Sequence, residues 1–127
     1  MSVTIVTAAK EGNYVQVQQC IQDGQDVNML EDGVTALYNA SKYGYLDIVQ
    51  LLLANNANVN IPRQGTIETP LLIAALNDSN DIIHALIVYT DPEIVAELTV
   101  LMDEGANIYT QLYSILINGI NSVRSPK

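Results

Sequence analysis

Few side chains in this sequence could carry out nucleophilic chemistry. The chain has one cysteine, Cys20, and one histidine, His84. An activated nucleophile needs a base within hydrogen-bonding reach. Cys20 falls on the apolar side of a predicted helix, and His84 lies between apolar residues in a different unit of the chain. We interpret both as structural residues, because a small buried cysteine usually serves only as core.

Metal and acid–base sites are not indicated either. Residues 56–60, NANVN, resemble the start of a calcium-binding loop, but Ile61 and Ile67 occupy the positions where that loop needs glycine and glutamate. Asp103 and Glu104 are adjacent, so on a helix they would point about 100° apart and could not face each other as an acid pair. We therefore predict no catalytic residue, no cofactor and no metal site, and no enzyme.

Length and composition predict a single domain over residues 1–127. The hydrophobic fraction is 49%, and 14 Asp and Glu against five Lys and Arg give a net charge of −9. A nucleic-acid partner is disfavoured, because binding to phosphates depends on clustered Lys and Arg. No apolar run approaches the length of about 18 residues needed to cross a membrane, and no basic residue precedes the first short apolar stretch, as a secretory signal requires. With a single cysteine, we expect a cytoplasmic protein, in its own cell or in a host cell.

An internal repeat organises the chain. The segment AAKEG at residues 8–12 recurs as ASKYG at residues 40–44, and DVN at 26–28 recurs as NVN at 58–60, in both cases 32 residues later. Between these markers, residues 47–53 have the apolar spacing of a helix with one buried face. Residues 35–41 predict a shorter helix that Thr35 caps. Each unit is therefore expected to be a pair of helices followed by a turn.

The unit at residues 33–60 resembles an ankyrin repeat. It has the glycine, capping threonine, leucine, small pair, second glycine, paired aliphatics, leucine run and final asparagine in order. The resemblance implies an all-α helix-pair solenoid of about three repeats, approximately 2–28, 29–60 and 61–90. It also implies that Tyr38, at the position of the family's structural histidine, packs between neighbouring turns. The first unit is expected to form an N-terminal cap, with Gln18, Gln19, Gln22 and Gln25 facing water.

The later units depart from this pattern. The third helix pair is predicted at residues 69–77 and 80–89, and the loop before it, around residues 62–68, is two residues longer and has Ile67 in place of the hairpin glycine. About fifteen inserted residues then predict an extra helix that Asp91 caps, and divergent helices extend over residues 91–121. The last helix is apolar around much of its circumference, so either the inserted helix covers it or it pairs with a second copy or another protein.

Members of the ankyrin family mostly bind proteins through their hairpin tips and the exposed side of each first helix. The resemblance therefore implies a partner protein of unknown identity, without nucleic acid or membrane. These positions do not pack the stack, so their side chains are free to specify a target. Tyr43 is the residue we favour most, because tyrosine offers a large contact area with few rotatable bonds. The predicted partner-binding residues are Lys10, Glu11, Glu31, Asp32, Val34, Lys42, Tyr43, Thr66, Glu68, Leu76 and Asn77.

The acidic residues are unevenly distributed. No Lys or Arg lies between Arg63 and Arg124, whereas eight acidic residues do. Such a surface keeps an apolar chain soluble, or it steers a basic partner, in which case salt weakens the association. An alternative function follows: a small acidic inhibitor or immunity-type protein that occludes a basic site on one dedicated enzyme.

Overall fold

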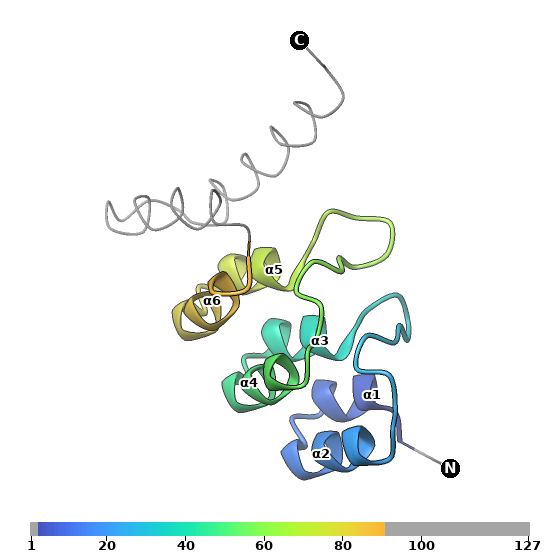
Figure 1. Cartoon of the computed structure of the whole chain (residues 1–127). Helices are drawn as coiled ribbons and strands as arrows, with labels where there is room; N and C mark the ends of the chain where they lie inside the picture. The colour runs from blue at the N-terminus through green and yellow to red at the C-terminus, as the bar shows by residue number, and fades with distance from the viewer. Residues whose placement is uncertain (1–2, 91–127) are drawn as a thin grey trace, which may run out of the picture.

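The computed structural model describes residues 3–90, which contain six α-helices and no β-strand. The helices form three successive pairs, and the pairs stack along one direction (Figure 1). The first helices of the pairs lie in one layer and the second helices in the other, as the predicted helix-pair solenoid requires. The six elements are α1 (Ile5–Lys10), α2 (Tyr14–Gln22), α3 (Ala36–Tyr43), α4 (Leu46–Ala54), α5 (Pro70–Leu76) and α6 (Asn80–Ile87).

Short polar side chains begin most of these helices. The side chains of Thr4, Thr35 and Thr69 each accept a hydrogen bond from a backbone amide in the first turn of α1, α3 and α5. Asn13 does the same for α2. A helix leaves its first amides without intrahelical partners, so these caps fix where each helix begins. The predicted cap at Thr35 is confirmed.

The core lies between the two helix layers. The helices of the first layer pack on one another, α3 against both α1 and α5, and alanines such as Ala8, Ala40 and Ala74 are fully buried on them. Small side chains let neighbouring backbones come close. The second layer contributes larger buried side chains, including Ile48 and Leu52 from α4. The thiol of Cys20 is buried as predicted.

The connections between pairs differ in shape. Residues 31–34 form a tight hairpin in which Glu31 and Val34 pair, and Asp32 and Gly33 both have positive φ, as two-residue type I′ turns require. The next connection closes between the Arg63 amide and the Glu68 carbonyl, 2.8 Å apart. It is two residues longer, and Gly65 supplies its positive φ. The expected difference in loop shape is confirmed.

His84, interpreted as a structural residue, is exposed on α6, with its ring Nδ1 2.6 Å from the Asn80 carbonyl oxygen. Two expectations are corrected. Gln25 faces water only in part: its amide oxygen accepts from the Ile5 amide at 2.8 Å and its amide nitrogen donates to the Val3 carbonyl at 3.0 Å, because the free backbone groups at the start of α1 need partners. The last helix of the third pair ends at Ile87 and does not reach Tyr89. The predicted helices over residues 91–121 and the self-association edge lie outside the described residues.

Candidate binding groove

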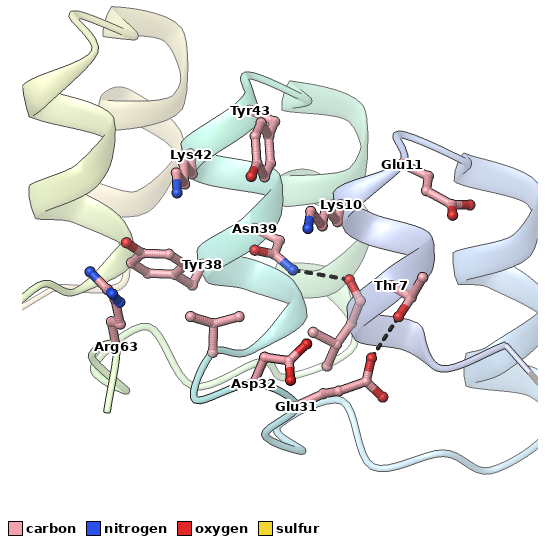
Figure 2. A pocket seen from close by; sticks show the side chains of 12 residues that line it. Thr7, Lys10, Glu11, Glu31, Asp32, Tyr38, Asn39, Lys42, Tyr43 and Arg63 are labelled. Atoms are coloured by element: carbon pink, nitrogen blue, oxygen red, sulfur yellow. Dashed lines mark hydrogen bonds between the residues drawn. The ribbon is translucent and has the colours of Figure 1, made fainter. Parts of the chain in front are cut away.

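A groove of about 530 Å³ runs across the first helix layer and the connections beside it. The end of α1 places Lys10 and Glu11 at one part of its wall, and the end of α3 places Lys42 and Tyr43 at the next (Figure 2). Three successive repeats contribute, because the loop before α5 adds Arg63. The lining residues are Val6, Thr7, Lys10, Glu11, Glu31, Asp32, Val34, Tyr38, Asn39, Lys42, Tyr43 and Arg63.

The groove brings together seven of the eleven residues predicted to bind a partner. These seven come from the first two repeats and the hairpin between them: Lys10, Glu11, Glu31, Asp32, Val34, Lys42 and Tyr43. The other four, Thr66, Glu68, Leu76 and Asn77, do not line it. Thr66 and Glu68 lie in the longer loop before α5, which does not repeat the geometry of residues 31–34. Leu76 and Asn77 lie at the end of α5.

Three of the four residues outside the groove are engaged within the stack. The Thr66 hydroxyl donates to the Arg63 carbonyl at 2.7 Å and accepts from the Glu68 amide at 3.1 Å, which holds the loop. Asn77 donates its side-chain amide to the Lys42 carbonyl at 2.8 Å, so it joins α5 to α3. Leu76 is 49% exposed at the end of α5.

Sequence reasoning missed five lining residues: Val6, Thr7, Tyr38, Asn39 and Arg63. Asn39 is only 6% exposed, and its side-chain amide donates to the Val6 carbonyl at 3.1 Å, which joins α3 to α1. Two features of the sequence point to Arg63: it is one of only five Lys and Arg residues in the chain, and it lies in the loop before a repeat's first helix, where ankyrin-like proteins present side chains.

Tyr38 packs between repeats, as its position predicts, and also borders the groove. Its side chain is almost fully buried, and its hydroxyl donates a hydrogen bond to the Glu68 carboxylate of the next repeat. Burial is the main cause that raises the pKa of the Tyr38 phenol far above its ordinary value, and the hydrogen bond and negative charge of Glu68 raise it further. The phenol therefore remains a hydrogen-bond donor at neutral pH.

The charges of the groove are mixed but unequally engaged. Lys10, Lys42 and Arg63 are all of the Lys and Arg residues between positions 3 and 90, and all three line it. The Glu31 carboxylate accepts from the Thr7 hydroxyl at 2.6 Å. The Lys42 ammonium lies 5.4 Å from the centre of the Tyr43 ring, within the range of a weak cation–π contact.

Residues 3–90 hold no group of three or more His, Cys, Asp or Glu side chains placed to share a metal ion. None of the six helices is long and apolar enough to cross a membrane.

A family model of ankyrin repeats, in three copies, matches residues 5–97. The chain belongs to the ankyrin-repeat family. Ankyrin repeats generally mediate protein–protein interaction, and the repeat domain is typically non-catalytic. In this ankyrin chain Cys20 lies on α2 and His84 on α6, with α4 packed between those two helices, so the cysteine and the histidine do not form a pair.

Curated relatives match this ankyrin chain over small parts of their own length. It is 31% identical over 112 residues to the Caenorhabditis elegans ankyrin repeat and KH domain-containing protein mask-1, which covers 88% of the chain and 4% of that protein. It is 40% identical over 91 residues to human BCL-6 corepressor-like protein 1, covering 68% of the chain and 5% of that protein. The mouse 2-5A-dependent ribonuclease is 39% identical over 75 residues, covering 58% of the chain and 10% of that protein. The chain thus spans a tenth or less of the length of these relatives.

Proposed function

We propose that this ankyrin-repeat chain is a non-catalytic protein-binding module that holds a partner protein in the groove across its first helix layer. The observation that carries the proposal is that seven positions from successive repeats, all implied by the ankyrin resemblance, line one groove. Val34 packs against the core and Glu31 accepts from Thr7. The other five side chains are exposed, so they are available to specify a target. We place the domain at residues 1–127, with repeats at about 2–28, 29–60 and 61–90, in the cytoplasm.

Tyr43 and Lys42 are the residues we propose to contribute most. Tyr43 is 43% exposed at the end of α3, where its ring can be covered by a partner without disturbing the core. Large aromatic side chains dominate the energy of many interfaces when water is excluded from them. The neighbouring ammonium of Lys42 supplies a charge that would orient the partner.

The inhibitor alternative depends on an acidic contact surface, and its support is the net charge of −9. The groove itself gathers every Lys and Arg of positions 3–90, so its composition favours the general binding module. Loss of activity in one captured enzyme would support the inhibitor instead.

The test is an affinity pull-down from the source organism with three forms of the chain at low and moderate salt. The double variant Lys42→Glu, Tyr43→Ala changes the groove. The double variant Gln18→Glu, Gln50→Glu changes net charge by the same amount at exposed positions of α2 and α4. A partner that wild type and control retain and the groove variant loses supports the proposal. A partner that all three forms retain would move the binding surface elsewhere.

A further inference from the structure

Equivalent positions at the ends of the three helices of the first layer are exposed along one side of the stack. Lys10, Lys42 and Leu76 occupy equivalent places near the ends of α1, α3 and α5, separated by 32 and 34 residues along the chain. All three side chains are exposed. Packed helices lie about 8–10 Å apart, so these positions form a row with one step of roughly that length per repeat.

The basic side chains of the groove have no hydrogen-bond partner among the described residues. Within residues 3–90, no side-chain hydrogen bond uses the ammonium of Lys10 or Lys42. The carboxylates of Glu11 and Asp32 are likewise unused, whereas the Glu31 carboxylate accepts from Thr7. Arg63 likewise donates no side-chain hydrogen bond to another described residue. A ligand that brings carboxylates would therefore find donors that the described part of the fold leaves unused.

The spacing of the row fits an extended peptide. In an extended polyproline-II conformation the chain advances about 3.1 Å per residue with three residues per turn, so every third side chain points the same way after about 9 Å. That length matches the step between repeats. Two acidic side chains three residues apart can thus meet Lys10 and Lys42, and an apolar side chain three residues further can cover Leu76.

Building on the proposed function, we infer that the groove of this chain, together with the exposed Leu76 beyond its lining, selects an extended acidic segment of its partner. The segment has two carboxylates three residues apart, followed or preceded at the same spacing by an apolar side chain. A nucleic acid fits less well, because its backbone carries a phosphate at every nucleotide. Glu11 and Asp32 line the same groove and would repel a continuous row of phosphates.

The test is selection of a displayed library of random twelve-residue peptides on the full chain. We expect enrichment of Asp or Glu pairs at three-residue spacing with Leu, Ile or Val three residues away. The affinity of a selected peptide should fall about tenfold or more for Lys10→Glu, Lys42→Glu, since both attractive pairs become repulsive. It should fall several-fold for Leu76→Ala, and stay unchanged for the control Gln18→Glu, Gln50→Glu. Circular dichroism checks that each variant keeps its helices.

Four outcomes would overturn the inference. They are enrichment of basic peptides, enrichment of acidic residues without the three-residue spacing, enrichment of nothing, and tighter binding of a twelve-nucleotide single strand than of any selected peptide at the same salt. None of these results alters the pull-down outcome for Lys42→Glu, Tyr43→Ala. The pull-down therefore tests the proposed function separately from the inference about the acidic segment.

Discussion

The junction between the first and second repeats is built differently from the junction between the second and third. At the first junction the backbone of Gly12 passes directly under the ring of Tyr45, and a Cβ placed there would lie 2.7 Å from ring carbons. The equivalent glycine of the second repeat, Gly44, has no other described atom within 4 Å of such a Cβ. The third repeat has Asp78 at this position, also with positive φ.

The second junction lacks this close approach and is joined by polar side chains. Tyr38 reaches Glu68, which lies in a loop two residues longer than the hairpin of residues 31–34, and Asn77 at the end of α5 reaches the Lys42 carbonyl. Side-chain hydrogen bonds join the repeats at both junctions, because Asn39 also donates to the Val6 carbonyl across the first. The comparison teaches that the first junction adds the close approach of a glycine backbone to an aromatic ring, which the second lacks. The two kinds of junction should respond to different substitutions.

Gly12→Ala is expected to have the largest effect. The substitution puts a side chain at positive φ and drives its Cβ into the Tyr45 ring, which together should cost roughly 2–4 kcal/mol of unfolding free energy. Gly44→Ala meets only the conformational cost, about 1 kcal/mol. Urea denaturation of both variants measures the difference. Equal costs would show that the close approach at the first junction contributes nothing.

Tyr38→Phe tests the second junction. Removing the phenol hydroxyl leaves the Glu68 carboxylate without its donor. We therefore expect the free energy of unfolding to fall by about 1–2 kcal/mol at pH 7. Because the pKa of the folded phenol is raised, the wild-type advantage is complete below pH 10, the ordinary value for tyrosine, and falls as the pH rises beyond it, since only the unfolded chain then loses the proton.

Unfolding free energies measured from pH 7 to pH 11 follow this effect. Tyr14→Phe is the matched control, because Tyr14 is 37% exposed and its hydroxyl forms no hydrogen bond with another residue of positions 3–90. A constant gap between wild type and Tyr38→Phe across this range would contradict the role given to the buried phenol.

Ser41→Ala should have the smallest effect, in the opposite direction. Ser41 is fully buried on α3, the helix common to both junctions, and its hydroxyl has no hydrogen-bond partner among the described residues. The equivalent positions of the neighbouring repeats are alanines, Ala9 and Ala75. Relieving the desolvated hydroxyl should raise stability by up to about 1 kcal/mol, measured as a rise in melting temperature. A lower melting temperature would mean that the hydroxyl is bonded.

The sequence predicted the helix pairs well because their determinants are local. A repeated register, threonine caps such as Thr35 and apolar faces recurring at helical spacing each act within a few residues. The four helices of the second and third repeats begin and end within a few residues of where these patterns place them. The hydrogen bonds of Gln25 could not be predicted in this way, because nothing in its own segment indicates that the start of α1 lies beside it.

The groove was predictable only where the repeats are regular. Positions taken from the first two repeats converged on it, whereas Thr66 was expected at a hairpin tip and instead holds its own loop together. Arg63, two residues before Gly65, lines the groove in its place. Insertions change side-chain direction in a way that periodicity does not report, and only the folded backbone shows which residue of a lengthened loop faces the ligand.

The amide of Gln64 donates to the carbonyl of Gly33 at 2.8 Å, so the third loop is supported by the hairpin of the preceding repeat. The position of the neighbouring Arg63 charge therefore depends on the repeat that precedes it. An engineer who transplants the third repeat onto another ankyrin scaffold would move its sequence without its geometry. The smallest portable unit of recognition in this chain is a repeat together with the hairpin that precedes it.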